Sequence, residues 1–133
     1  MRYTPAMNAY LLVFLGAGLG GALRHGVNLS CARYCGPEFP WGTVVVNVVG
    51  SLLMGLAAGY FTYKAGESWA QSARLFATTG VLGGFTTFSA FSLDAINLWE
   101  RGATGAASLY VLASVIFSLL GLVVGLALVR GLT

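Results

Sequence analysis

Two apolar stretches of this sequence each carry a row of polar side chains at helical spacing. In WGTVVVNVVGSLLMG, Thr43, Asn47 and Ser51 follow one another at intervals of four residues, so a helix places them on one face. Their hydroxyl and amide groups are neutral hydrogen-bond donors. Lipid cannot satisfy such groups, so a row of them on an apolar helix indicates a polar partner helix or a water-filled path.

A second row lies towards the C-terminus, where Tyr110, Ser114 and Ser118 have the same spacing. Neither row contains a carboxylate. Asn47 strengthens the case for a path, because a primary amide at membrane depth is costly unless a partner group meets it. We therefore expect the two rows to face a route for a polar solute or ion. Packing between helices is the alternative that the serines alone leave open.

Residues 80–92, GVLGGFTTFSAFS, combine three glycines with four hydroxyl residues. Glycine costs a helix about 1 kcal/mol relative to alanine, and threonine is stiffened by its branch point, so we expect a helix to break near Gly83 and Gly84. Backbone carbonyls freed at such a break suit a hard cation. Beyond it, Phe88 and Phe91 share a helix face, either as ordinary core aromatics or as part of the path.

The composition defines the elements that must position these groups. Only 8% of the 133 residues are charged and 57% are hydrophobic, which excludes an ordinary soluble domain. The charges leave four uncharged runs of about 20 residues or more, the length that crosses a hydrocarbon core. These runs are Tyr3–Leu23, Phe39–Tyr63, Leu75–Leu93 and Gly102–Val129. We predict an all-α membrane protein, one domain over residues 1–133, with transmembrane helices at about 6–32, 41–63, 70–98 and 104–130, the third broken mid-membrane near 80–87.

Several other classes of protein are disfavoured. The net charge of +3 is too small and too scattered for a nucleic-acid surface, so we expect no nucleic-acid partner. The first apolar run lacks a convincing small-residue cleavage site, so we expect it to be retained and not removed as a signal peptide. Cys31 and Cys35, even together with His25, lack the spacing of a metal site, and we interpret the cysteines as small apolar residues.

Positive charges are divided almost evenly between the two sides of a four-helix topology. Four lie on the side of the termini and three on the other. They are Arg2, Lys64, Arg74 and Arg130 on the first side, and Arg24, Arg33 and Arg101 on the second. Such a small asymmetry does not select an orientation, so two copies in opposite orientations can pair as an antiparallel homodimer. The count leaves open the alternative of a single orientation.

Three ordered motifs on a chain of this length resemble the Fluc (CrcB) family of small fluoride channels. They are GAGLGGALRHG in the first expected helix, WGTVVVNVVGS in the second and GGFTTFSAF in the third. The resemblance implies a channel and not an enzyme. It implies an antiparallel, dual-topology homodimer in the cell (inner) membrane, in contact with lipid, with two fluoride pores that relieve fluoride toxicity. It also implies a structural Na⁺ at the dimer centre that is not transported.

The resemblance implies roles for individual residues. The Na⁺ ligands would be the backbone carbonyls of Gly83 and Thr86. The residues that line the pore would be Asn47, Phe88, Phe91, Thr43, Tyr110, Ser114 and Ser118, and Arg24 would lie in the vestibule. Two positions depart from the family pattern: Ala90 stands where threonine is frequent, and Asp94 stands near the helix end where glutamate is common.

The polar groups suit fluoride, which holds its water strongly. Neutral donors and the positive edges of aromatic rings can replace that water without trapping the ion. We expect passive transport, because none of the four uncharged runs contains a carboxylate that could couple protons. A proton-coupled drug exporter of the small multidrug resistance type is the alternative, but Tyr3–Leu23 lacks the carboxylate that such an exporter needs in its first helix. A purely structural membrane protein explains close packing but not a broken third helix.

Overall fold

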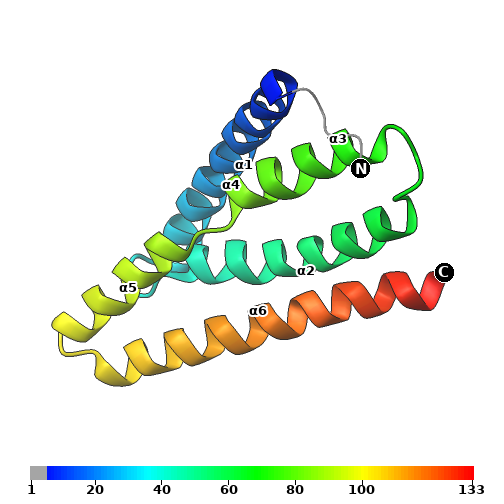
Figure 1. The fold of residues 1–133 in the computed structure, drawn as a ribbon. Coiled ribbons are helices and arrows are strands. Elements are labelled where there is room, and N and C mark those ends of the chain that lie inside the picture. Colours follow the sequence, from blue (N-terminus) through cyan, green and yellow to red (C-terminus); the bar gives the residue numbers. More distant parts are fainter. Residues whose placement is uncertain (1–5) are drawn as a thin grey trace.

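The computed structural model describes residues 6–133, and within them every element is a helix (Figure 1). The elements are α1 (Ala6–Cys35), α2 (Trp41–Tyr63), α3 (Ala70–Arg74), the π-helix η1 (Leu75–Leu82), α4 (Gly83–Phe85), α5 (Phe88–Glu100) and α6 (Thr104–Leu132). Arg2, one of the positive charges in the orientation count, lies outside the described residues.

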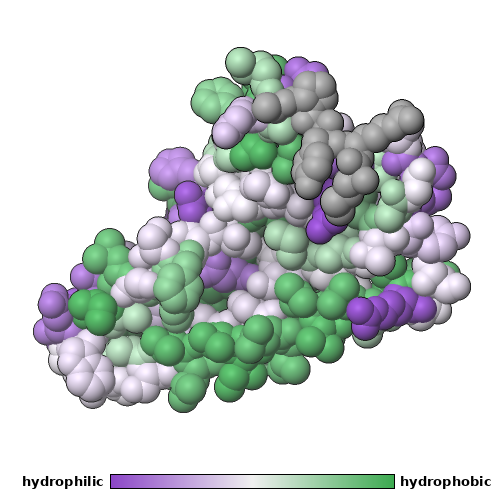
Figure 2. All heavy atoms as spheres, in the orientation of Figure 1, coloured by the Kyte–Doolittle hydropathy of each residue, from purple (hydrophilic) through white to green (hydrophobic). Residues whose placement is uncertain are grey.

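Three of these helices are long and apolar enough to cross a membrane: Met7–Cys35, Trp41–Tyr63 and Thr104–Leu132. Figure 2 shows hydrophobic side chains gathered along α6, where Leu109 and Leu119 are each 64% exposed. An exposed apolar surface of this extent is suited to lipid and unsuited to water.

Tight turns join the long helices where glycine permits a left-handed backbone. Gly36 follows the last residue of α1 and has a φ of 84°. Gly102 lies between α5 and α6 and has a φ of 80°. Residues with a side chain rarely adopt this conformation, which is why glycine commonly follows the last residue of a helix.

The third expected span is divided, and its extended backbone lies beyond the two glycines. Gly83 and Gly84 belong to α4, whereas Thr86 has φ −83° and ψ 161° and Thr87 has φ −155° and ψ 122°. The interruption lies within the expected range 80–87, but it falls just beyond Gly83 and Gly84, near which the helix was expected to break. Gly84 serves packing instead, because a Cβ there would overlap the backbone of Ala17 on α1. Threonine is β-branched and adopts extended backbone readily.

The helices pack through small residues. α2 packs along α6, and a Cβ added to Gly55 would overlap the Leu122 carbonyl of α6. α1 packs against η1 and α4 in the same way, with Gly16 close to the backbone of Gly80. Close backbone approach of this kind is how helices associate in lipid, where apolar side chains gain little from leaving their surroundings. α5 packs against α6.

A small apolar cluster joins α5 to α6. Its buried members are Phe91, Leu98, Ala107 and Tyr110. Phe91 and Tyr110 pack with ring centroids 5.3 Å apart. This cluster sets the position of α5, and with it the position of the break that precedes α5, against α6.

Candidate functional site

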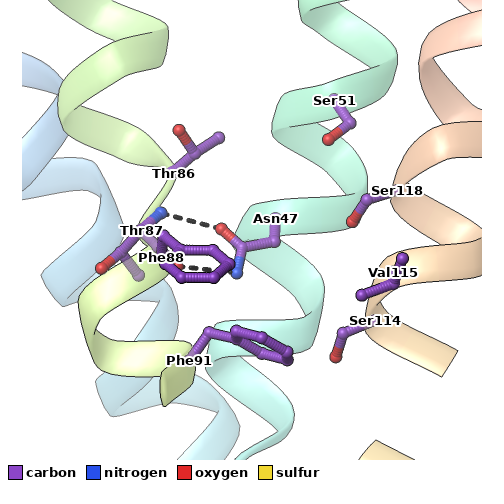
Figure 3. Close-up of a pocket in the computed structure, with 9 residues that line it drawn as sticks. All are labelled: Asn47, Ser51, Thr86, Thr87, Phe88, Phe91, Ser114, Val115 and Ser118. Atoms are coloured by element: carbon purple, nitrogen blue, oxygen red, sulfur yellow. Dashed lines mark hydrogen bonds between the residues drawn. The ribbon is translucent and has the colours of Figure 1, made fainter. Parts of the chain in front are cut away.

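A cavity of about 240 Å³ lies where the break meets α2 and α6 (Figure 3). Its lining comes from three parts of the chain that are far apart in sequence. These residues are Asn47 and Ser51 of α2, Thr86, Thr87, Phe88 and Phe91 at the break and the start of α5, and Ser114, Val115 and Ser118 of α6. Five of the predicted pore residues are therefore brought together: Asn47, Phe88, Phe91, Ser114 and Ser118.

Asn47 holds the break from the side of α2. Its Oδ1 accepts a hydrogen bond from the Thr87 backbone amide at 2.8 Å, and its Nδ2 donates to the Thr87 carbonyl at 2.9 Å (Figure 3). A primary amide carries two N–H groups, so one of those of Asn47 is not used by this pairing. The side chain therefore fixes Thr87 and still has a donor to offer beside the cavity.

The break presents the N-terminus of α5 to the cavity. Thr87 caps this helix, because its Oγ1 accepts the Ala90 amide at 3.2 Å. The first backbone amides of a helix have no carbonyl partner within it and carry partial positive charge. Phe88, the first residue of α5, lines the cavity. An anion is stabilised at such a position without any formally charged side chain.

Ser114 supplies an unpartnered hydroxyl to the same cavity. The residue is only 4% exposed, and its Oγ has no hydrogen-bond partner among the described residues. A buried polar group without a partner costs about 1–3 kcal/mol. The hydroxyl is therefore suited to a ligand or a water that enters the cavity.

The two phenylalanines differ in burial although they share a face. Phe91 is 8% exposed, whereas Phe88 is 78% exposed, and their ring centroids are 5.5 Å apart with the planes inclined at 48°. Tilted rings turn edges as well as faces towards their surroundings, and the edges carry positive potential. Phe91 is fixed within the fold, whereas the ring of Phe88 is largely unpacked.

Thr43 and Tyr110 do not line the cavity. Thr43 Oγ1 donates to Asp94 Oδ2 at 2.8 Å, and the Tyr110 hydroxyl donates to the same oxygen at 3.1 Å. The prediction placed Asp94 near a helix end, but it lies in the middle of α5, level with Thr43 at the start of α2. The two polar rows therefore converge on a carboxylate that the sequence analysis did not assign to them. Its spacing of three residues from Phe91 is the signal that could have found it.

Arg24 contacts the break from the side of α1. Its Nη1 donates to the Thr86 carbonyl at 3.2 Å, and its side chain is half-buried. The structure thus gives the predicted vestibule residue a backbone partner. With Asn47 on Thr87, two polar side chains from two helices support two successive residues of extended backbone.

Gly83 and Thr86 carry backbone carbonyl groups at the two ends of α4, since Gly83 is its first residue and Thr86 follows its last. Gly83 is exposed, and a Cβ there would meet only the Thr78 carbonyl, at 3.5 Å. Carbonyl oxygens are the ligands that hard cations use at broken membrane helices, so these two groups fit Na⁺ in kind, and the Thr86 oxygen also accepts the hydrogen bond from Arg24. Two carbonyls are fewer oxygens than a hard cation normally takes, so these two groups alone do not make a complete site.

Sequence reasoning missed several residues of the site. Thr87 and Val115 line the cavity without having been singled out, and Ser51 was recognised in the polar row but not assigned to the pore. Position in the row was the signal for Ser51, and the N-cap pattern before an apolar helix was the signal for Thr87. Cys31 is half-buried and Cys35 exposed at the end of α1, away from the cavity lining.

Residues 11–126 match the profile of the family described as CrcB-like protein, Camphor Resistance (CrcB). This chain belongs to the CrcB family. A relative from Rhodopseudomonas palustris (strain BisB5) is 59% identical over 124 residues, which cover 93% of this chain and 98% of the relative. A relative from Nitrobacter hamburgensis is 58% identical with the same coverage, and one from Beijerinckia indica is 54% identical over 96% of this chain and 100% of its own length.

The CrcB match includes every residue of the cavity, from Asn47 to Ser118, as well as Arg24. The three relatives carry the name fluoride-specific ion channel FluC. Membership of the CrcB family, together with the long apolar helices, makes this chain a multi-pass membrane protein.

Proposed function

We propose that this protein is a fluoride-selective, passive ion channel that lets fluoride leave the cell and so relieves its toxicity. The observation that carries the proposal is the unpartnered Ser114 hydroxyl, buried in a cavity that also meets the N-terminus of α5. The names of the relatives support fluoride as the ion.

The cavity has the chemistry that a small, strongly hydrated anion requires. The Ser114 and Ser118 hydroxyls and the unused N–H of Asn47 are donors that replace water around the ion, and the ring edges of Phe91 add positive potential. Among the described residues, no Lys or Arg lines the cavity. Several weak neutral contacts bind an anion without holding it, and conduction needs both entry and release.

The working unit in this proposal is an antiparallel, dual-topology homodimer. The nearly even split of positive charges supports insertion in both orientations. The exposed ring of Phe88 and the exposed Gly83 support a second copy at this face, because each leaves part of a site without neighbours. The partner copy would then complete the aromatic lining of each of two pores.

A structural Na⁺ is part of the proposal. When bound, the ion would supply positive charge that holds the broken segments of two chains together. The Gly83 and Thr86 carbonyls of each copy would be its ligands, and the exposure of Gly83 supports their access to a shared site.

Flux from liposomes tests the function. Purified protein reconstituted into vesicles loaded with fluoride is expected to release it rapidly, and vesicles loaded with chloride are expected to retain their content. Equal release of both ions, or no release of fluoride, would overturn the proposal. Accessibility of an N-terminal tag in whole cells tests the topology separately: labelling of only one membrane face would contradict dual insertion but leave the ion assignment standing.

A further inference from the structure

The backbone hydrogen bonds around the break change partner at one residue. In a continuous helix each amide donates to the carbonyl four residues earlier. The Thr86 amide still does so, reaching the Leu82 carbonyl at 3.0 Å. The Thr87 amide, which would continue the series to Gly83, donates instead to Asn47 Oδ1 at 2.8 Å. Asn47 therefore takes the donor that helix geometry would direct to Gly83.

This change of hydrogen-bond partner determines which backbone carbonyl is available to a ligand. Backbone carbonyls are strong hydrogen-bond acceptors, and they pair with a donor whenever one is within reach. The Gly83 carbonyl has lost its helical donor, and Gly83 lies at the exposed surface of α4. Asn47 also donates to the Thr87 carbonyl at 2.9 Å, so both polar ends of its amide hold Thr87 in the extended conformation. Removing the amide would let Thr87 turn back towards Gly83 and lengthen α4.

We propose that Asn47 is a positioning residue for the cation site, because its Oδ1 holds the Thr87 amide away from the Gly83 carbonyl and so keeps that carbonyl free to bind Na⁺. This inference rests on the Na⁺ site of the proposed function. Asn47 would then act on two sites, because it also lines the anion cavity. Cation binding and the shape of the cavity are then coupled through Thr87.

The acceptor and the donor of Asn47 can be separated by substitution. Asn47→Leu removes both, whereas Asn47→Asp keeps an oxygen that accepts from the Thr87 amide. Ser51→Ala is the matched control, because Ser51 lies one turn further along the same face of α2 and lines the same cavity, and it is not among the hydrogen-bond partners of Thr87.

The experiment is a Na⁺ titration of the thermal unfolding midpoint of the detergent-purified full chain, with N-methyl-D-glucamine replacing Na⁺ at constant ionic strength. We expect the Na⁺ concentration for half-maximal stabilisation to rise at least about tenfold in Asn47→Leu, to stay within about threefold in Asn47→Asp, and not to change in Ser51→Ala. A wild-type response to Na⁺ with an equal response in Asn47→Leu would overturn this inference alone. Equal losses in Asn47→Leu and Asn47→Asp would also overturn it, because the acceptor would not be the decisive group.

A wild-type chain that does not respond to Na⁺ would overturn the Na⁺ site of the proposed function, and this inference with it. If Asn47→Leu does not fold, the carbonyl can be examined directly. Only Gly20–Gly21 and Gly83–Gly84 are paired glycines in the sequence, so ¹³C-carbonyl, ¹⁵N-glycine labelling leaves two directly bonded signals. The Gly83 carbonyl shift of the wild type is expected to be that of a carbonyl without an amide donor and to move when Na⁺ replaces N-methyl-D-glucamine. A shift equal to that of helical Gly20 in both salts would contradict the inference.

Discussion

Arg24 on α1 donates a hydrogen bond to the backbone carbonyl of Thr86, at 3.2 Å and across 62 residues of sequence. The guanidinium therefore supports the extended backbone of the break directly. A cation at this place also attracts anions towards the cavity, since its charge acts beyond the contact distance. These two roles respond differently to substitution.

Replacing Arg24 is expected to reduce both stability and flux. Arg24→Met should lower the free energy of unfolding by about 1–3 kcal/mol, because a hydrogen bond from a charged donor to half-buried backbone is lost. Arg24→Lys keeps the charge but not the guanidinium fork, so it should lose stability and keep more of the flux at low salt than Arg24→Met. Denaturation in detergent and efflux at two salt concentrations measure these effects. A fully stable Arg24→Met would show that the contact with Thr86 contributes nothing.

Ser114→Ala is expected to change flux and stability in opposite directions. Removing a buried hydroxyl that has no partner in the protein should leave the stability unchanged or raise it by about 1 kcal/mol, because a desolvation cost disappears. Loss of a donor to the anion should lower fluoride efflux about tenfold or more. Ser108→Ala is the control, since Ser108 is exposed on the same helix and donates to the Thr104 carbonyl. A normal flux in Ser114→Ala would remove Ser114 from the pore.

Phe88→Ile is expected to cut the fluoride flux strongly while leaving the proposed dimer intact. The Phe88 ring is 78% exposed in the single chain, so its replacement removes little packing within that chain. Isoleucine is apolar but has no ring edge with positive potential for an anion to meet. Vesicle efflux and chemical crosslinking of the same preparation give the two readings. Unchanged efflux from a crosslinkable dimer would exclude Phe88 from the ion path.

Asp94 is expected to be coupled energetically to Thr43 and Tyr110, because one carboxylate oxygen accepts from both hydroxyls. Asp94→Asn should cost about 1–3 kcal/mol, because an amide oxygen is a weaker hydrogen-bond acceptor than a carboxylate oxygen. A double-mutant cycle of Asp94→Asn with Tyr110→Phe should give a coupling energy of about 1 kcal/mol. Additive effects in denaturant unfolding would show that the 3.1 Å contact carries no energy of its own.

The polar rows were predictable because a membrane-crossing helix has almost no reason to carry neutral polar residues at regular spacing. Asn47, Ser114 and Ser118 follow from that argument and line one cavity. Thr43 and Tyr110 belong to the same rows but donate hydrogen bonds to Asp94. Helical spacing gives the direction of a side chain around its own axis, and it says nothing about how far along a neighbouring helix the partner lies.

The position of the break likewise depended partly on sequence and partly on packing between helices. A cluster of glycine and threonine indicated poor helix sequence in the third span, but both residue types weaken a helix, and local propensity alone did not choose between them. The choice depends on neighbours: Gly84 is helical because α1 packs against it, and Thr87 is extended because Asn47 takes both its backbone groups.

Composition and periodicity alone determined that this chain is a helical membrane protein, which stretches are long and apolar enough to cross a membrane, and that the two polar rows carry neutral side chains. These follow from the cost of placing charge and unpaired backbone in hydrocarbon, which acts on each segment separately. Only the tertiary structure decided which carbonyl lost its donor, which hydroxyl was left without a partner, and which arginine supports the break. Those properties belong to contacts between helices, and a contact exists only when two distant segments are packed together.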